Sequence, residues 1–523
     1  MLDSLSKEEW DFVQGVWDTF ESMRPDIAKV ERNLMGKEPE WIEATPIQTK
    51  FGTYRGGYYP AVYDPGESLR TEQMAAEEEA KRQLRGARTA ATVRSNFVKG
   101  RAEEVKGRPI LLTMDATFNG LTDVVHYLAY KEWLVDANRI LRAVDGTIRE
   151  RYGAEMTRQL RTAVEAIAAG EATNPHALDK PLRHIRIGSM VAGLGFNIVN
   201  AVMQPLGLTQ SIVRIGPKYV AQGVAEFVKS PIELGKTVLE KSSFMRNRKR
   251  TQNRELNDLR NSLRGKSEPR QFIDGAMFLP MTAIQMTVDI PTWWGAYQKA
   301  QTEGFDEESS IQIADQAVLA SQGGGQMKDL AAIQRGSEFV KIFTVFYGYF
   351  NTAYNLGVER IRGTNPRSPA QIARLATDLL LIYSVPAVMG ALIKEAFRIG
   401  DEDDDEEIAK KLAAEQLSFL FGTMVGVREA AGAAQIMFGL STSGGLGYNG
   451  PAGLRFFNEL NKFSQQANQR ELDRAFVRAG VNVAGIALHL PSAQINRTID
   501  GVIAMSEGRT QNPVALVGGA PPQ

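Results

Sequence analysis

The chain of 523 residues contains no cysteine and only four histidines. Without cysteine there can be no disulfide, thiolate zinc site, iron–sulfur cluster or cysteine nucleophile. Neither H-E-x-x-H nor G-x-S-x-G occurs, and LGKT at 234–237 is no phosphate-binding loop, because Ser230 stands where the preceding glycine is required. The histidines are scattered, at His126, His176, His184 and His489. We therefore expect no enzyme activity, no catalytic residues, no cofactor and no metal site.

The chain also has no net charge, because 61 basic residues balance 61 acidic ones. Any affinity for nucleic acid or anionic lipid must then come from a local patch. The strongest patch is 241–270, with ten basic and three acidic side chains. Three interpretations stay open: a solvated helix with a flexible linker, a contact to DNA phosphates, or a contact to an anionic membrane leaflet. The candidate contact residues are Arg246, Arg248, Lys249, Arg250 and Arg254.

A signal peptide is not expected, because the first ten residues, MLDSLSKEEW, have neither a basic region nor an apolar one. Long runs of Leu, Ile, Val and Phe are missing too. Four uncharged runs are only weakly apolar and contain Gly, Ala, Ser and Asn; they lie at 188–213, 379–393, 430–454 and 479–496.

Small residues allow helices to approach closely, and Asn or Gln can hydrogen-bond between helices. The runs are therefore either buried core helices or segments that enter a membrane once partners cover their polar groups. In the first run, GSMVAGLGFNIVNAVMQPLGLTQSIV, the residues whose surroundings distinguish these two interpretations are Gly188, Asn197, Asn200, Gln204 and Pro205.

Strand patterns are scarce and helix signals are frequent, which predicts a mainly α fold, an elongated multi-helix architecture with long loops and little β. Capping boxes at 6–9 and 368–371, and Asp306, mark helix starts. We expect helices over 116–140 and 144–170, and one from 369 to 400 that kinks at Pro386. The Gly-, Tyr- and Pro-rich stretch at 51–67 predicts an ordered loop with turns.

The composition changes along the chain suggest six regions. They are an N-terminal helix and Gly/Tyr/Pro-rich loop (1–66), a charged helical arm (67–108), a helical region with a weakly apolar segment (109–240), a basic linker (241–270), an apolar and aromatic helical region (271–400), and an acidic loop with a C-terminal helical region (401–523).

An aromatic run at 339–356 has side chains that step by four, three, four and four, as on one face of a helix. Most such faces are core. A face this large could also be a contact between subunits or with a membrane, because aromatic residues dominate interface energetics. Its members are Phe339, Phe343, Phe346, Phe350 and Tyr354.

Three segments carry a resemblance to a known group of proteins: GGYYPAVYD (56–64), MVAGLGFNIVNAVMQPLGLTQSIVRIG (190–216) and DLAAIQRGSEFVKIFTVFYGYFNTAYNL (329–356). Together with their spacing they resemble the large polyvalent proteins inside the virions of short-tailed bacteriophages, in particular the internal virion or DNA-ejection proteins. None of the three is a catalytic motif. Some members of the group carry a peptidoglycan-cleaving module, and this sequence has no counterpart of it, which puts a wall-degrading role in doubt.

The resemblance implies a protein stored in the virion interior that leaves through the portal and tail before the genome. It would then reassemble in the host cell envelope as part of a channel for DNA. The implied partners are the portal, other ejection proteins, DNA, the host cell membrane and further copies of the chain.

Two other functions stay open. One is a virion-delivered enzyme, such as a peptidoglycan hydrolase or a polymerase accessory, with a site built from dispersed carboxylates. The other is a soluble helical scaffold or host-interaction protein that never meets lipid.

Overall fold

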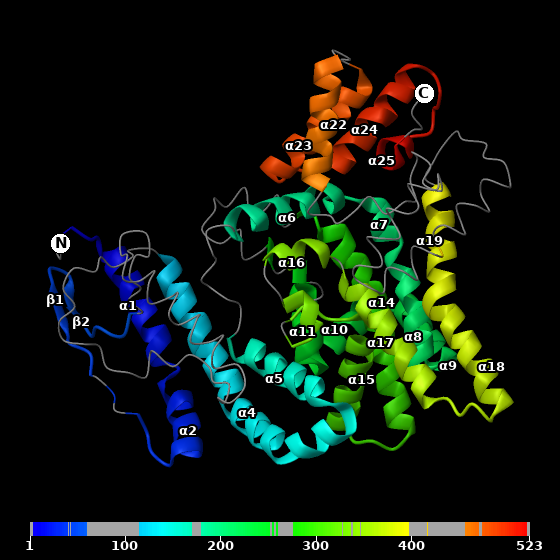
Figure 1. Ribbon diagram of the computed structural model, residues 1–523. Helices are drawn as coiled ribbons and strands as arrows, with labels where there is room; N and C mark the ends of the chain where they lie inside the picture. The colour runs from blue at the N-terminus through cyan, green and yellow to red at the C-terminus, as the bar shows by residue number, and fades with distance from the viewer. Residues whose placement is uncertain are drawn as a thin grey trace. The chain divides into compact units, whose positions relative to one another are not determined.

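The computed structural model describes residues 4–39, 41, 43–59, 114–169, 179–251, 254–255, 258–259, 276–326, 328–335, 338–345, 347–396, 416, 455–469 and 473–519. It is 80% helical with two short strands, which confirms the predicted mainly α class. The chain divides into two compact units, Met1–Asn174 and Pro175–Gln523, and each is described by itself (Figure 1). The predicted arm at 67–108 and the acidic run at 401–407 lie outside the described residues.

The first unit packs two N-terminal helices and a small hairpin with two later helices. Ser6 and Glu9 form the predicted capping box at the start of the first helix. Its core includes Phe20, Ile27 and Tyr127, all of them buried. The elements are α1 (Lys7–Glu21), α2 (Arg24–Met35), the antiparallel strands β1 (Ile47–Thr49) and β2 (Gly52–Tyr54), α4 (Met114–Tyr152) and α5 (Ala154–Ala169).

The predicted break between helices near residue 142 is wrong. α4 continues through Gly146 to Tyr152, and the chain turns at Gly153, whose φ of 85° is in the left-handed region. Glycine adopts that conformation without a steric penalty, whereas a glycine inside a helix only weakens it. The sequence contains both glycines, and the one that takes the left-handed conformation, Gly153, ends the helix.

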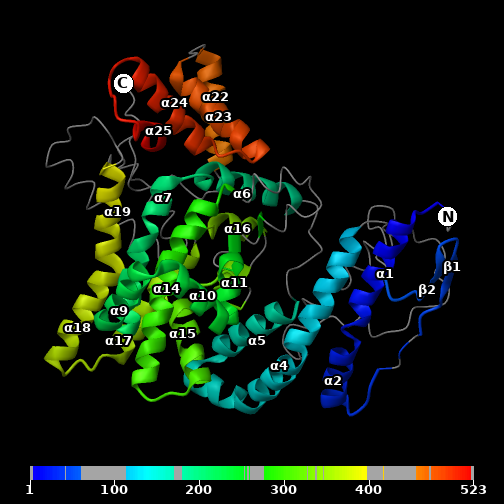
Figure 2. The same cartoon turned by 180° about the vertical axis from the view of Figure 1, so that it is seen from behind.

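The second unit is a helical assembly in which several helices pack on α14, whereas the helices after residue 454 form a group that packs on α6 (Figures 1 and 2). Its helices are α6 (Asp179–Leu194), α7 (Ile198–Val202), η2 (Gln204–Gly207), α8 (Leu208–Ile215), α9 (Pro217–Lys229), α10 (Pro231–Lys241), α11 (Ser243–Thr251), α14 (Leu279–Thr302), α15 (Glu307–Gln322), η3 (Ala332–Arg335), α16 (Glu338–Phe343), α17 (Tyr347–Gly363), α18 (Pro369–Leu379), η4 (Leu380–Ser384), α19 (Val385–Ala396), α22 (Arg455–Gln469), α23 (Arg474–Leu488), α24 (Ser492–Ser506) and α25 (Ala515–Gly518).

Helix α14 forms the centre of the largest core cluster. Trp293 on this helix is fully buried, and its Nε1 donates to Asp315 of α15 at 2.7 Å. Buried side chains of α9 and α10, such as Val220 and Val238, complete the cluster. The predicted cap of α15 is confirmed, because the Asp306 side chain accepts from the N–H of Ser309.

The predicted helix from residue 369 onward is present, but it is not regular throughout. Ser368 caps α18, and η4 is a single π-helical turn between α18 and α19. Pro386 follows that turn. A proline inside a helix lacks the N–H donor and clashes with the carbonyl four residues earlier, and a wider π turn relieves that clash. The irregularity predicted at Pro386 is therefore absorbed in the turn before it.

Candidate functional site

The uncharged run at 188–213 is divided among α6, α7, η2 and α8. Phe196 takes a left-handed φ of 53°, and the chain direction changes by 76° between Pro181–Leu194 and Ile198–Ile215. By length and composition, these two arms together correspond to one broken membrane span. The run therefore forms no straight span in this conformation.

The polar residues of this run have partners within the chain. Asn197 is buried; its Nδ2 donates to the carbonyl of Gly193, and its Oδ1 accepts from Arg497 of α24 at 2.9 Å. Gln204 donates to the carbonyl of Asn200 at 3.2 Å, and both side chains are half-buried. Pro205 is exposed in the first turn of η2. Asn197 is thus covered by α24 of the same chain, as is expected of a buried core helix.

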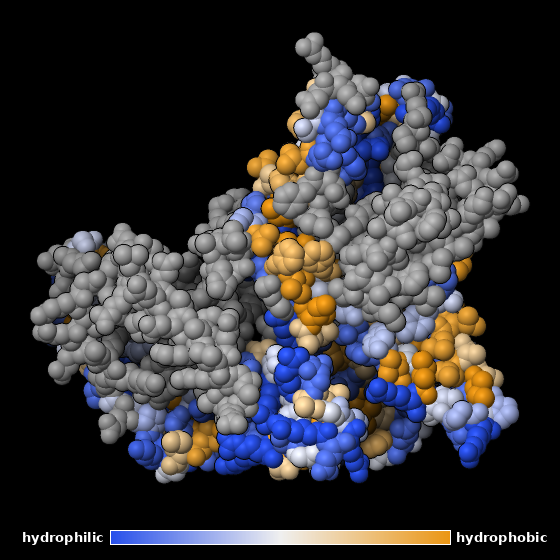
Figure 3. All heavy atoms as spheres, in the orientation of Figure 1, coloured by the Kyte–Doolittle hydropathy of each residue, from blue (hydrophilic) through white to orange (hydrophobic). Residues whose placement is uncertain are grey.

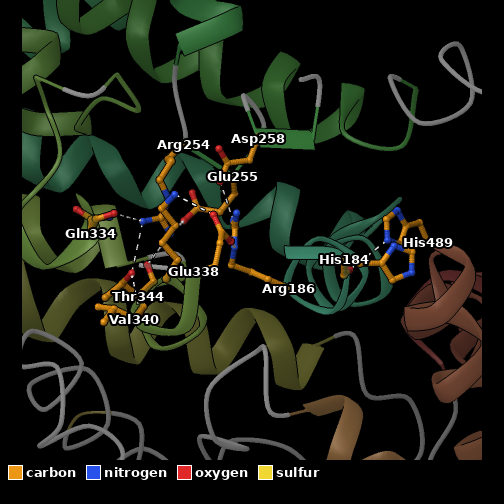
Figure 4. Close-up of polar contacts among 11 residues, drawn as sticks. His184, Arg186, Arg254, Glu255, Asp258, Gln334, Glu338, Val340, Thr344 and His489 are labelled. Atoms are coloured by element: carbon orange, nitrogen blue, oxygen red, sulfur yellow. Dashed lines mark hydrogen bonds and ion pairs between the residues drawn. The ribbon is translucent and has the colours of Figure 1, made fainter. Parts of the chain in front are cut away.

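Gly188 allows α6 to touch α23. A Cβ at this position would lie 2.0 Å from the carbonyl oxygen of Ile486, so only glycine fits. Beside it, the rings of His184 and His489 lie 4.3 Å apart, and each Nε2 hydrogen-bonds to backbone across the contact (Figure 4). Gly188 therefore has a packing role in this conformation, because a residue without a side chain lets α6 and α23 touch.

Helix Pro369–Ile393 is the described segment best suited to crossing a membrane. It has 25 residues, is long and apolar enough, and only 33% of its most apolar window is buried. Large apolar side chains along it face solvent, with exposed fractions of 47% for Ile372, 56% for Leu380 and 45% for Leu392. Apolar side chains gather at the lower right of Figure 3, where α18 lies in Figure 1. A core helix of a soluble protein would be mostly buried.

A cavity of about 370 Å³ lies beneath α19. Small or compact residues of α19, Pro386, Ala387 and Gly390, form one wall. Met203 and Leu206 of the bent segment contribute another. Charged and polar side chains, among them Arg248, Arg254 and Gln322, complete the lining, so the pocket wall is partly polar and partly apolar.

Two of the five candidate contact residues for nucleic acid or anionic lipid are buried in this conformation. Arg248 is only 1% exposed and pairs with the fully buried Asp289 at 2.8 Å; Arg254 is 5% exposed and binds Glu255, the Gln334 carbonyl and Thr344. Neither can reach a phosphate in this conformation. Arg246 is exposed on α11, and Lys249 and Arg250 lie on the same helix. The run at 241–251 is thus a packed helix and not a flexible linker.

A buried ion-pair network joins α6, α16 and the residues that follow α11 (Figure 4). Arg186 is 1% exposed and lies 2.7 Å from Asp258 and 3.0 Å from Glu338. Burying such charges costs free energy unless each is paired with an opposite charge at close distance. The network therefore favours one arrangement of these elements, and the loss of one partner destabilises the fold because it leaves a buried charge unpaired.

This network predicts an acid-sensitive stability. Burial alone would raise the pKa of Glu338, but the charges of Arg186 and Lys341 outweigh it and hold that pKa below its ordinary value of 4.5. A carboxylate whose pKa is lower in the folded than in the unfolded state stabilises the fold at pH values above its unfolded pKa. This stabilisation is lost as the pH falls through the folded pKa. We expect Glu338→Gln to reduce the free energy of unfolding by roughly 1.5–3 kcal/mol at pH 7.

Urea unfolding at a series of pH values would measure this effect. The difference between wild type and Glu338→Gln should shrink below pH 4.5 and vanish once Glu338 is protonated in both states. Glu226→Gln is the control, because Glu226 is exposed and its oxygen lies 3.9 Å from Lys229. A difference that stays constant down to pH 2.5 would contradict the role given to the Glu338 charge.

The aromatic run at 339–356 forms two helices and not one, which corrects the predicted single face. α16 ends at Phe343, and α17 begins at Tyr347. Phe339 (57% exposed) and Tyr354 (42%) are open to solvent, whereas Phe343 and Phe350 are half-buried. Phe346 lies outside the described residues. The four described rings are therefore divided between two helices and differ in exposure.

Sequence reasoning missed the acidic partners of the buried arginines and Asp378 of α18. A usable signal was present: Asp289 is the sole charged residue in the apolar run 279–298, and only Arg374 and Asp378 are charged within 369–393. A lone carboxylate in an apolar helix is expected to meet a cation from elsewhere in the fold.

Among the described residues, no group of three or more His, Asp or Glu side chains is placed to hold a metal ion. No protein-family model, curated protein or solved structure matches the chain.

Proposed function

We propose that this chain is an internal virion protein of a short-tailed bacteriophage that is released before the genome. In the host envelope it associates with the membrane and forms, with other copies and other ejection proteins, part of a channel for DNA. The observation that carries the proposal is the exposed apolar surface of the Pro369–Ile393 helix, which has the length of a membrane span and little of its most apolar window buried. In this view the protein is structural and has no catalytic site.

Other features support a chain with a soluble form and a membrane form. The bent segment at 181–215 supplies a second apolar element, whose Asn197 is covered by α24 in the soluble form. Without cysteine, no disulfide opposes a change of fold. In a bilayer, the polar groups of both segments would need cover from neighbouring helices, which favours an oligomer.

Flotation with phosphatidylcholine–phosphatidylglycerol vesicles, with and without a chaotrope pulse, tests the proposal. We expect the wild-type chain to float, more so after the pulse. Leu380→Lys should lower the floating fraction strongly, because a lysine near the centre of a span reduces insertion by roughly a hundredfold. Ile232→Lys on α10 is the matched control, since Ile232 is 73% exposed but lies outside both apolar segments.

A chain that remains wholly soluble under all conditions would contradict the proposal, as would equal losses for the two lysine variants. Peptidoglycan zymography tests the enzyme hypothesis separately. Cleavage that a single Glu→Gln change abolishes would establish a catalytic site instead.

A further inference from the structure

Asp378 is the one acidic residue within the Pro369–Ile393 helix. It is the tenth of 25 residues, so it lies within about 5 Å of the helix midpoint at 1.5 Å per residue. An ionised aspartate at that depth opposes insertion by roughly a hundredfold. Arg374 lies nearer the end, where a long side chain can reach the interface.

In the folded unit this carboxylate is withdrawn from solvent and faces Arg360 of α17 at ion-pair distance, without a hydrogen bond. Asp378 is 9% exposed, and its Oδ2 lies 3.7 Å from Nε of Arg360. Arg360 in turn donates through Nη2 to the carbonyl of Val213 on α8. The arginine therefore ties α18 to both α17 and α8.

The other attachments of this helix include the π turn that follows Asp378 and the buried face of α19, where Ala387 and Ala391 are each 4% exposed. Ile382 is fully buried in a small cluster with Val213, Ala353 and Leu356. Tyr383 donates to the carbonyl of Ala353 at 3.2 Å. Beyond them, α19 lines the cavity of about 370 Å³. The ion pair is thus one of several contacts that hold an apolar helix whose other side chains, such as Leu380, face solvent.

We propose that the Arg360–Asp378 contact is a latch that holds the Pro369–Ile393 helix on the soluble unit, and that the Asp378 charge sets the barrier to membrane insertion. The inference rests on the proposed function and specifies its regulation. Two consequences separate the parts of this latch. Removing the arginine releases the helix but leaves the Asp378 charge in it. Removing the aspartate releases the helix and also eliminates that charge.

Release is measured in solution on the cysteine-free chain with one introduced thiol, Ala391→Cys. Ala391 is 4% exposed in α19, so maleimide labels this position only when the helix lifts. We expect Arg360→Met and Asp378→Leu each to speed labelling about tenfold. Asp500→Leu is the control, because Asp500 is a half-buried partner of two arginines, Arg474 and Arg478, but lies on α24.

Insertion is measured with phosphatidylcholine vesicles and an environment-sensitive probe on Leu380→Cys. Asp378→Leu should raise the vesicle partition coefficient at least about 30-fold, with a smaller rise for the isosteric Asp378→Asn. Arg360→Met should raise it less than about threefold. Circular dichroism shows whether each variant still folds. The labelling rate of Asp500→Leu shows whether losing an ion pair elsewhere in the unit also releases the helix.

The outcomes distinguish the latch from the proposed function. If no variant, including Asp378→Leu, enters vesicles, the proposed membrane function is overturned. If variants enter vesicles but Asp378→Leu and Asp500→Leu do so equally, the latch is overturned while the membrane function stands. An unchanged labelling rate in Arg360→Met would also overturn the latch, since the helix would then be held by other contacts.

Discussion

Replacing Arg248 with methionine should lower the free energy of unfolding of the second unit by about 3–5 kcal/mol, because it strands an ionised Asp289 in the core. Both partners are almost fully buried, at 1% and 0% exposure, and their ion pair measures 2.8 Å. The arginine also donates to the Gly323 carbonyl, and Gln285 donates to the second carboxylate oxygen. Urea unfolding followed by tryptophan fluorescence measures the change, since Trp293 and Trp294 lie on the same helix as Asp289.

Two further variants show whether the loss comes from the stranded charge. Arg248→Met combined with Asp289→Leu removes both charges and should recover much of the stability, because well-packed apolar pairs can replace buried ion pairs. Arg214→Met removes the bidentate but largely exposed pair with Glu359 and should cost at most about 1 kcal/mol. Equal losses in Arg248→Met and Arg214→Met would show that Arg248 is accessible, as its predicted contact with DNA or lipid requires.

Local signals in the sequence predicted local structure well. Ser6 with Glu9, Asp306 and Ser368 each begin a helix as predicted, because a cap is a contact between residues three apart. The same holds for the length and apolar character of the 369–393 helix. Where two glycines competed, as at Gly146 and Gly153, local sequence could not say which would end α4, since either glycine can adopt the left-handed conformation.

Long-range contacts were beyond the sequence patterns. The basic run at 241–270 suggested exposed cations, but Arg248 meets Asp289 at a separation of 41 residues, and Arg186 meets Glu338 at 152. Charge counting treats every cation as solvated and cannot see a carboxylate that arrives from another helix. The aromatic periodicity at 339–356 predicted one helix for a related reason: the spacing continues past Phe343, where α16 ends and a turn at residues 344–345 begins.

Helices α9 and α14 cross at two glycines, and this crossing predicts the second large effect. A Cβ on Gly223 would lie 2.1 Å from the carbonyl oxygen of Pro291, and one on Gly295 would lie 2.3 Å from that of Tyr219. In both positions the obstacle is backbone, so relief requires the helices to separate. We expect Gly223→Ala to lower the free energy of unfolding by about 1–3 kcal/mol, as overpacking of a core does.

Gly235→Ala gives the matched control, because Gly235 is a buried glycine of α10, another helix packed on α14. The added Cβ would meet only the Ile290 Cδ1, at an ordinary 3.7 Å. Here the helix propensity of alanine should act without a clash and raise stability by roughly 0.5–1 kcal/mol. Opposite signs for the same chemical change in two neighbouring helices would show that backbone contact at the crossing determines the effect. If Gly223→Ala were also stabilising, the helices would have to lie farther apart than this structure places them, and the tight packing of α9 on the core would be wrong.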